Sequence, residues 1–399
     1  MRLPGRGGAV HAWGAVRSNR LGFGSLTLWS TANSNQPHKV DCPPDAVQVS
    51  AGSGHSAILT SRGEVWTFGQ GDRGQLGHGN FKDSSNPKKV EALPPCQWVS
   101  AGSDHTLAVS KEGFVFGFGN CTYGQLGLGT RAFRVGTPKL VTAFQDLGER
   151  ISKVTAGYRV SAAITDNGKL YTFGCKNYNS LGHDQKPAIV LFDYLRIGAR
   201  GAQAIPKLVT ALRNQPVEDI HFGTAHALAV LRDKRIYGWG TGAGYVFGDG
   251  TQKPRLKPEE CVELNQYGVE KIAVGSAHAV GVTRTGSVIH WGYKEHVNSF
   301  GITFGETSAH MPQHPSAVYW FSENKHHFGD IVGLGAGLHF SVAIGEKGTV
   351  AWGWNSKGQL GEGTVTNSAE PVYVGRHRLS SPKLQMVSCG TMHSLAIGR

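Results

Sequence analysis

Five histidines stand at the same position of a phrase that recurs along the chain, and histidine is well suited to binding metals or moving protons near neutral pH. The phrase is a small residue, glycine, two further residues and then histidine. Two copies carry Val160 and Phe340 instead. This tolerance favours structural histidines that hydrogen-bond between strands or blades over a metal ring or a set of bases. The wide spacing of one histidine per repeat also argues against a single metal site. The predicted structural positions are Gly52, His55, Gly102, His105, Gly157, Gly223, His226, Gly275, His278, Gly337, Gly390 and His393.

Other signatures of catalysis in the sequence are weak. Residues 69–74 match the G-x-G-x-x-G pattern of dinucleotide sites, but such a site needs a helix after the glycines. Here the repeat's own turn, Gln75-Leu76-Gly77, follows instead. The sequence has no G-x-S-x-G nucleophile elbow, no phosphate-binding P-loop and no H-E-x-x-H zinc motif. We therefore expect a binding or scaffold protein without a cofactor, and not an enzyme with covalent chemistry of its own.

The elements that carry these residues are short strands. An aromatic residue followed by glycine also occurs seven times, first at Trp13-Gly14, and it follows the histidine phrase across two short apolar runs. The turn between these runs usually contains glycine, as at Arg62-Gly63, which is the pattern of a β-hairpin. About four strands in each repeat of 50 to 66 residues are typical of a propeller blade. The 56 glycines, about twice the usual share, therefore mark blade turns.

The two ends of the chain complement each other. The chain opens on an aromatic-glycine phrase that no histidine phrase precedes, and it ends on a histidine phrase at residues 389–393 that no aromatic-glycine phrase follows. Joining the two halves completes a seventh blade and leaves no sheet edge unpaired. We predict an all-β, seven-bladed β-propeller, closed by pairing of the N- and C-terminal strands in one blade. It is expected to form a single domain over residues 1–399, with insertions at about 183–206 and 295–330.

The phrases A-G-x-x-H-S, G-x-V-x-x-[WF]-G and G-Q-L-G-x-G resemble the repeats of the regulator of chromosome condensation family, over about residues 8–398. The resemblance implies a seven-bladed propeller whose termini share one blade. It leaves the function open, because relatives include a Ran exchange factor that docks on chromatin, a plant ultraviolet-B photoreceptor, ribosome-associated mitochondrial proteins and modules of ubiquitin ligases. The photoreceptor's Gly-Trp-Arg-His-Thr run is absent from this sequence, which argues against light sensing.

The net charge of +12 is concentrated in two sectors. Residues 131–213 carry 13 lysines and arginines against 5 acids. Residues 1–40 and 371–399 carry 5 and 4 basic residues, respectively, and no acid. Concentrated positive charge indicates an anionic partner such as RNA. The candidate partner-binding residues are Arg17, Arg20, Lys186, Arg196, Arg200, Lys207, Arg376 and Arg378.

We therefore expect a non-enzymatic scaffold that binds an RNA- or ribosome-containing assembly through these basic sectors, as a monomer within a larger complex. The resemblance implies one alternative, a guanine-nucleotide exchange factor for a small Ran-like GTPase. A second alternative is a protein-interaction scaffold in a large complex. No apolar run is long enough for a transmembrane helix, so membrane insertion is not expected.

Six widely spaced cysteines without a C-x-x-C pair favour a reducing intracellular compartment. The first 40 residues are rich in arginine and free of acids, as mitochondrial presequences are, so the expectation leans towards the mitochondrion over the nucleus. The second insertion is rich in histidine but has no fixed ligand spacing, so no metal site is predicted. Its histidines are His296, His310, His314, His326 and His327.

Overall fold

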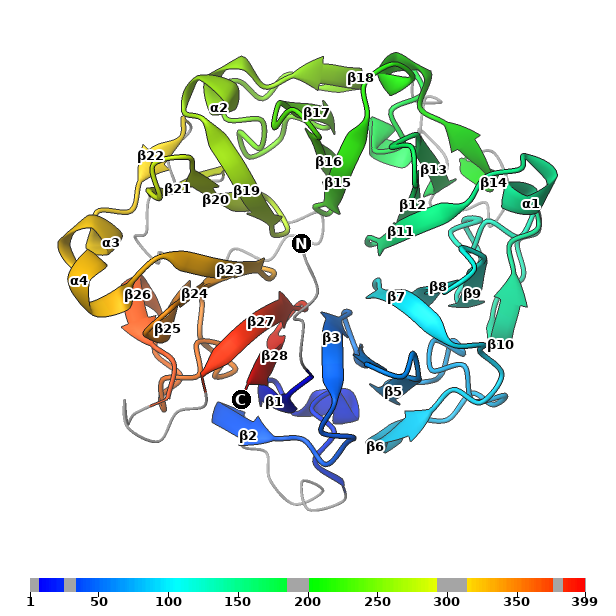
Figure 1. The fold of residues 1–399 in the computed structure, drawn as a ribbon, viewed down its shortest axis with the longest axis horizontal. Coiled ribbons are helices and arrows are strands. Elements are labelled where there is room, and N and C mark those ends of the chain that lie inside the picture. Colours follow the sequence, from blue (N-terminus) through cyan, green and yellow to red (C-terminus); the bar gives the residue numbers. More distant parts are fainter. Residues whose placement is uncertain (1–6, 25–33, 185–200, 293–313, 376–382, 399) are drawn as a thin grey trace.

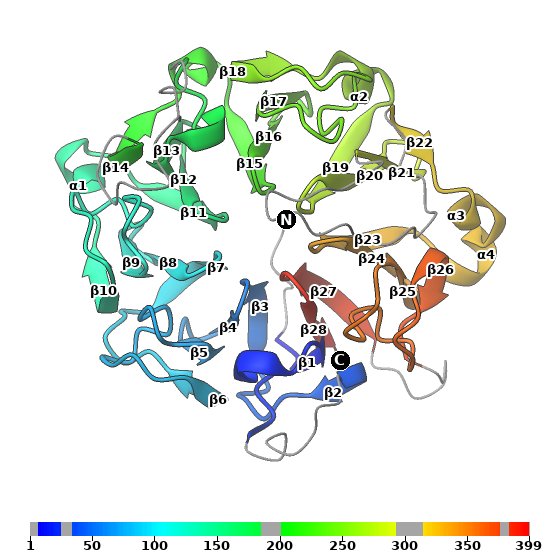
Figure 2. The same ribbon diagram turned by 180° about the vertical axis from the view of Figure 1, so that it is seen from behind.

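Seven antiparallel sheets of four strands each surround a common axis in the computed structural model (Figure 1). The structure describes residues 7–24, 34–184, 201–292, 314–375 and 383–398. Figure 2 shows the same ring from behind, with β3, β7, β11, β15, β19, β23 and β27 nearest the axis. The predicted fold class, an all-β propeller of seven blades, is confirmed.

We number blades 1 to 6 in chain order and call the closing blade blade 7. Blade 1 comprises β3 (Ala46–Ala51), β4 (His55–Thr60), β5 (Val65–Gly69) and β6 (Ser84–Lys89). Blade 2 comprises β7 (Cys96–Ala101), β8 (His105–Ser110), β9 (Val115–Gly119) and β10 (Val135–Leu140). Blade 3 comprises β11 (Ile151–Ala156), β12 (Val160–Thr165), β13 (Leu170–Cys175) and β14 (Ala202–Leu208). Blade 4 comprises β15 (Val217–Phe222), β16 (His226–Leu231), β17 (Ile236–Gly240) and β18 (Arg255–Glu260).

The remaining blades follow the same plan. Blade 5 comprises β19 (Val269–Val274), β20 (His278–Thr283), β21 (Val288–Gly292) and β22 (Ser316–Ala317). Blade 6 comprises β23 (Ile331–Ala336), β24 (Phe340–Gly345), β25 (Gly348–Gly353) and β26 (Ser368–Tyr373). Blade 7 comprises β27 (Leu384–Cys389), β28 (His393–Gly398), β1 (Ala9–Gly14) and β2 (Ser34–Lys39).

Helical segments are few and short among the described residues. They are α1 (Ala143–Asp146), α2 (Val262–Gln266), α3 (Trp320–Glu323) and α4 (Lys325–Phe328), with 3-10 turns η1 (Arg17–Asn19), η3 (Asn177–Asn179) and η4 (Thr210–Leu212). None of the described helices is long and apolar enough to cross a membrane. Both predicted insertions end in regular structure, because β14 occupies 202–208 and β22, α3 and α4 occupy much of 316–328.

Blade 7 closes the ring with strands from both ends of the chain. β1 pairs with β28 in antiparallel register from Ala9 opposite Gly398 to Gly14 opposite His393. β28 pairs in turn with β27 on its other side. The predicted closure by N- and C-terminal strands is therefore confirmed, and both middle strands of this blade have two neighbours each.

The alternating strand direction gives the ring two different faces. Connections between the first and second strands, and between the third and fourth strands, lie at one end of every blade. We call this end the long-connection face, because it carries the third-to-fourth connections such as residues 70–83 and 120–134. The opposite, short-turn face carries the hairpin turns between second and third strands and the links between blades, including α1 to α4.

The hairpin turns of blades 1 to 5 each contain a residue with a positive φ, which explains the glycines of four of them. Gly168 has a φ of +83°, a conformation that glycine adopts without steric cost. Blade 4 has Lys234 at the equivalent position, and its φ is also positive, at 73°. The turn geometry is therefore kept in blade 4 even though its residue type is less favourable there.

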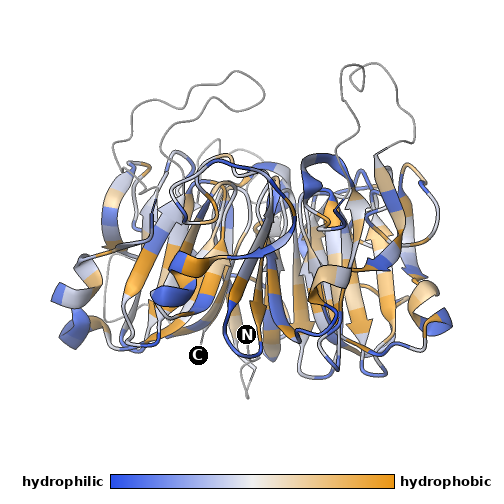
Figure 3. Ribbon diagram, turned by 90° about the horizontal axis from the view of Figure 1, so that it is seen from above, coloured by the Kyte–Doolittle hydropathy of each residue, from blue (hydrophilic) through white to orange (hydrophobic). Residues whose placement is uncertain are grey.

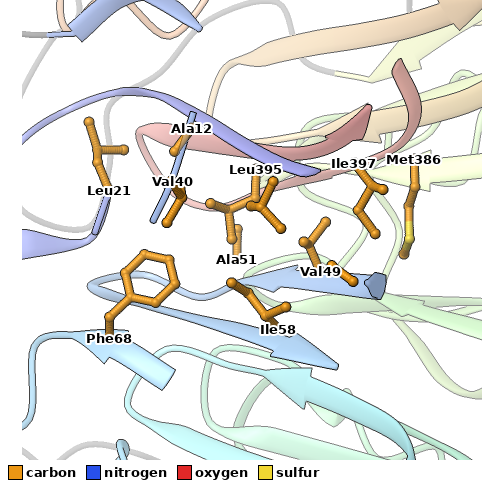
Figure 4. Close-up of a cluster of buried hydrophobic side chains, with 12 residues drawn as sticks. Ala12, Leu21, Val40, Val49, Ala51, Ile58, Phe68, Met386, Leu395 and Ile397 are labelled. Carbon is orange, nitrogen blue, oxygen red and sulfur yellow. The ribbon is translucent and has the colours of Figure 1, made fainter. Parts of the chain in front are cut away.

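The hydrophobic core lies within and between the blades. Figure 3 shows that apolar segments are concentrated in the strands, whereas the connections at the rims are more polar. One cluster joins blade 7 to blade 1, with Leu395 and Ile397 packed near Val49 and Ile58 (Figure 4). The aromatic of each aromatic-glycine phrase is buried between blades. In blade 2 this aromatic is Phe118, and Gly77 of blade 1 leaves room for it. A Cβ at Gly77 would lie 2.9 Å from the Phe118 side chain.

Candidate partner-binding surface

Four of the five recurring histidines contact a hydroxyl of the next blade. His55 Nε2 lies 2.8 Å from Thr106 Oγ1, and His105 Nε2 lies 2.8 Å from Ser161 Oγ. Equivalent pairs join His278 to Ser341 at 3.2 Å and His393 to Ser56 at 3.1 Å. The hydroxyl is always that of the residue after the histidine position in the next repeat, so the contacts link neighbouring blades.

The hydrogen-bond geometry assigns a protonation state to these rings. Thr106 Oγ1 donates to the Gln75 carbonyl at 2.8 Å, so its oxygen is left to accept a hydrogen bond from His55 Nε2. His55 Nδ1 then carries a lone pair, and it has no hydrogen-bond partner within the described residues. Gly52 packs against this edge, because a Cβ there would lie 2.8 Å from His55 Nδ1. In the glycine-histidine phrase, the glycine therefore packs against a neutral imidazole.

Burial reinforces the neutral state. It lowers the pKa of His55, His105 and His278 to about 3 and that of His226 to about 4. These rings are almost completely inaccessible to solvent. A base or a metal ligand must be reachable, so this set of histidines offers no site for proton transfer or metal binding.

Blades 3, 4 and 6 depart from the pattern. Val160 replaces the histidine of blade 3, and the next blade correspondingly has Ala227 where a hydroxyl would stand. His226 faces the position of Ala279, and its Nε2 has no hydrogen-bond partner among the described residues. These histidine–hydroxyl contacts between blades are therefore missing on both sides of blade 4. They are also missing after blade 6, which has Phe340 at the histidine position.

The predicted basic residues are not brought together by the described part of the structure. Arg17 is exposed in η1 of blade 7, and Lys207 is exposed on β14 of blade 3. Arg20 is 9% exposed, and its guanidinium donates to the carbonyls of Arg17 at 2.7 Å and Ser53 at 2.9 Å. Arg20 therefore ties blade 7 to blade 1 and presents little surface to a partner. Lys186, Arg196, Arg200, Arg376 and Arg378 lie outside the described residues.

A different basic cluster occupies the long-connection face of blades 1 to 3. Arg73 lies over the ring of Phe133 at 4.6 Å, and Arg134 lies over the ring of Phe81 at 3.8 Å. Each arginine comes from one blade and each ring from its neighbour, so blades 1 and 2 exchange reciprocal cation–π contacts. We call this cluster the arginine–aromatic surface. Its members are Arg73, Arg131, Arg134, Arg159, Phe81, Tyr123, Phe133, Tyr158 and Tyr178.

Arg159 extends the surface into blade 3. Its guanidinium lies 4.8 Å from the ring centre of Tyr123 and 4.9 Å from that of Tyr158, and it donates to the Tyr123 hydroxyl at 3.1 Å. Asp104 lies close by, where burial raises the pKa of its carboxyl. The sequence carried a signal for this surface in the basic-aromatic neighbours Phe133-Arg134 and Tyr158-Arg159. Their loops belong to different repeats, so their proximity could not be deduced from spacing.

The structure divides the basic sector at 131–213 into paired and unpaired charges. Arg150 pairs with Asp166 at 3.1 Å on the short-turn face, and Lys153 pairs with Asp219 at 2.5 Å. By contrast, Arg131, Arg134 and Arg159 have no carboxylate within 4.0 Å in the described part of the chain. Arg73 has Asp72 at 3.5 Å. The long-connection face of blades 1 to 3 thus keeps uncompensated guanidinium groups available for an anion.

A metal centre is not seen in the ranges that the structure covers. No group of three histidine, cysteine or acidic side chains lies close enough to hold an ion there. His314 instead contacts Glu263 at 2.8 Å, and His326 and His327 lie in α4. His296 and His310 of the histidine-rich insertion lie outside the described residues.

The fold and these surfaces define a closed repeat propeller whose distinctive groups lie on its connections. Two family models match the chain: the RCC1-like domain over residues 3–267 and the regulator of chromosome condensation (RCC1) repeat over residues 349–397. The chain therefore belongs to the RCC1-like propeller family, and the resemblance seen in its repeats is confirmed.

Curated relatives share the repeats but differ in length. The ultraviolet-B receptor UVR8 of Arabidopsis thaliana is 32% identical over 98% of this chain and 71% of its own length. A protein RCC2 homolog of Danio rerio is 30% identical over 91% of this chain and 73% of its own length. The human E3 ubiquitin-protein ligase HERC2 is 29% identical over 98% of this chain, which spans only 6% of that ligase.

Solved structures agree with the fold. Human WBSCR16 superposes with a TM-score of 0.79 at 21% identity, covering 98% of both chains. Prp20p of Saccharomyces cerevisiae superposes with a TM-score of 0.79 at 20% identity, covering 100% of this chain and 93% of its own. The Prp20p structure was described together with the binding of that protein to Gsp1p and histones. At these identities the similarity establishes the common fold.

Proposed function

We propose that this protein is a non-catalytic docking propeller that binds an RNA-containing assembly, such as a ribosomal particle, through its arginine–aromatic surface. The observation that carries the proposal is the reciprocal stacking of Arg73 on Phe133 and of Arg134 on Phe81. Arginine binds phosphate through its fork of N–H donors while its plane stacks on rings. Basic grooves lined with aromatic rings are a recurring feature of RNA-binding proteins.

Binding to phosphates through arginines makes RNA affinity depend on salt concentration in a predictable way. Each phosphate contact releases a counterion, so affinity for a single strand falls with salt with a slope of about −0.7 per contact. If the four arginines of the surface each bind one phosphate, affinity falls about 50-fold between 50 and 200 mM salt. Removing two of them must reduce this slope as well as the affinity.

The test compares two double variants in RNA titrations of the full chain at several salt concentrations. Arg131→Ala/Arg134→Ala is expected to weaken binding and lower the salt slope by about 1.4. The matched control, Arg62→Ala/Arg284→Ala, removes the same charge from the short-turn face, where both side chains are well exposed. No binding at low salt, or an equal effect of both variants, contradicts the proposal.

A second candidate function is guanine-nucleotide exchange on a small GTPase. The superposition with Prp20p, a protein studied with Gsp1p, is the observation that favours it. Such a propeller would insert a connection into the GTPase and stabilise its nucleotide-free state, with no covalent step. The assay measures release of labelled GDP from a panel of small GTPases. Failure of this protein to accelerate release from any of them removes this candidate.

We also propose that the propeller works in a reducing intracellular compartment, the mitochondrion before the nucleus, as a monomer within a larger complex. Cys42, Cys96, Cys121, Cys261 and Cys389 carry free thiols, and three of these, Cys96, Cys121 and Cys261, are buried. Reduced thiols are typical of such compartments. Imaging of the tagged full chain against organelle markers, and identification of the proteins and RNA that co-purify with it, test the location and the complex together.

A further inference from the structure

We propose that the arginine–aromatic surface takes single-stranded RNA, with unpaired bases stacked on its exposed rings, in preference to an RNA duplex. This inference rests on the function proposed above and names the form of RNA that the same surface recognises. It depends on three observations: the exposure of the rings, the stacking of the arginines on them, and their arrangement across three blades.

The rings are unusually exposed for their size. Phe133 is 60% exposed, Tyr178 53%, Tyr158 40% and Phe81 38%. All four belong to connections on the long-connection face, in blades 1, 2 and 3. Apolar surface gathered on one face marks a binding site more often than scattered exposure does. A flat base is a suitable cover for a flat ring, because stacking needs no particular base sequence.

The arginines lie against the rings in a position that suits a nucleotide. Arg134 lies 3.8 Å from the ring centre of Phe81, and Arg73 lies 4.6 Å from that of Phe133. A stacked guanidinium keeps its outer face for a base and its edge N–H groups for phosphate oxygens. Ring and cation are therefore placed so that one nucleotide can be held by its base and by its backbone. Among the described residues no carboxylate forms an ion pair with Arg134, and its guanidinium donates only one long hydrogen bond, to the Asp72 carbonyl at 3.5 Å.

The same geometry discriminates against a duplex. In A-form RNA the base faces are stacked on one another, and the helix offers mainly phosphates and 2′-hydroxyls to a protein. A duplex can use the arginines of this surface but not its rings. An unpaired strand can use both, and it can bend along the curved row of connections from blade 1 to blade 3.

The contacts between arginines and rings also join neighbouring blades, so their role could be structural instead of RNA binding. A structural role predicts a different experimental result. If Arg73 and Arg134 stack on the rings only to hold blades 1 and 2 together, removing a ring lowers the melting temperature and leaves RNA affinity unchanged. Binding and stability must therefore be measured on the same variants.

The experiment measures fluorescence anisotropy of the full chain with three probes: an unstructured labelled RNA 12-mer, the corresponding 12-base-pair RNA duplex, and inorganic polyphosphate. We expect the single strand to bind about tenfold or more tightly than the duplex, since one or more stacked bases distinguish them. Phe133→Ala is expected to weaken single-strand binding about tenfold and to leave duplex binding unchanged.

Two variants complete the design. Phe114→Ala is the matched control, because Phe114 is 40% exposed in the same blade but lies in the β8–β9 turn on the short-turn face. It is expected to change no affinity. Arg134→Lys keeps the charge and loses the planar stacking group. It is therefore expected to weaken binding of the single strand more than binding of the duplex.

The outcomes separate this inference from the function on which it rests. If none of the probes binds at low salt, both fail. If single strand, duplex and polyphosphate bind alike and Phe133→Ala changes nothing, RNA docking by charge stands and the single-strand inference is overturned. A lower melting temperature of Phe133→Ala with unchanged binding overturns it too. The single-strand inference is supported if Phe133→Ala weakens binding of the single strand more than binding of the duplex and Phe114→Ala does not.

Discussion

At the scale of single residues, the histidine positions show how a repeat keeps its geometry while its chemistry varies. Most blades use a neutral imidazole that donates to a hydroxyl of the next blade, as His105 does to Ser161. His226 has lost that partner, because the equivalent residue is Ala279. A buried polar group without a partner costs free energy of folding. The repeat pattern identifies the histidine, but only the register between blades shows which residue faces it.

We predict that Ala279→Ser stabilises the protein by about 1 kcal/mol, because the new hydroxyl would accept from His226 Nε2 as Ser341 does from His278. Chemical denaturation measures the free energy of unfolding. The control is Ala227→Ser, which faces Val160 and gains no such bond. Equal effects of the two substitutions would show that the histidine contact is not the cause.

At the scale of elements, the boundary between blades 3 and 4 has a different set of contacts from most other boundaries. Five of the other boundaries link consecutive histidine phrases through their backbones, as by the Ser103 N–H donating to the Gly157 carbonyl at 3.1 Å. Between blades 3 and 4 the described residues show no such bond, and the side chain of Phe222 lies against Gly157 instead. The main polar link there is the pair of Lys153 and Asp219 at 2.5 Å, with both side chains 14% exposed.

We predict that Asp219→Asn destabilises this boundary by about 3 kcal/mol, because it leaves the ammonium of the largely buried Lys153 without its carboxylate partner. Burial acts to raise the pKa of Asp219, but the positive charges of Lys153 and His221 have the larger effect. The pKa is lowered well below its usual value, so the carboxyl stays ionised. Amide hydrogen exchange is expected to rise most in β11 and β15. Glu218→Gln is the matched control on the same strand, because its pair with Lys234 is well exposed and contributes less than about 1 kcal/mol.

At the scale of the whole molecule, the buried histidines make stability depend on pH. Their pKa values are lowered in the folded ring, to about 3 for His55, His105 and His278, against an ordinary value of 6.5. The unfolded chain therefore takes up more protons below pH 6.5. Stability is fully present above that pH and is lost progressively as pH falls towards 4.

We predict a fall in the unfolding free energy of about 1.4 kcal/mol per pH unit for each such histidine below pH 6. Thermal melts between pH 7.5 and 5 measure it. The variant His226→Val, which uses the residue of blade 3, should show a slope that is smaller by about one proton. A melting temperature that stays constant from pH 7 to pH 5 would falsify this account.

The fold could be predicted almost completely from the sequence, because seven copies of a phrase at regular spacing leave few alternatives to a closed ring. The orphan half-units at the two ends even indicated which blade is split. The candidate surface could not be predicted in the same way. Arg73 and Phe133 come from different blades and meet only because connections of one type share a face. Arg20 counted as a free cation in the sequence, yet its guanidinium binds two backbone carbonyls.

The pairing of Ala9 with Gly398 places the two described ends of the chain side by side on the short-turn face. Blades 1 to 6 each have a turn between the second and third strands at the place where blade 7 has the two chain ends. A circular permutant that joins these ends and opens another such turn would keep all seven sheets. Its new termini would again emerge opposite the arginine–aromatic surface, so a tether or fused partner at any of these turns leaves that surface uncovered.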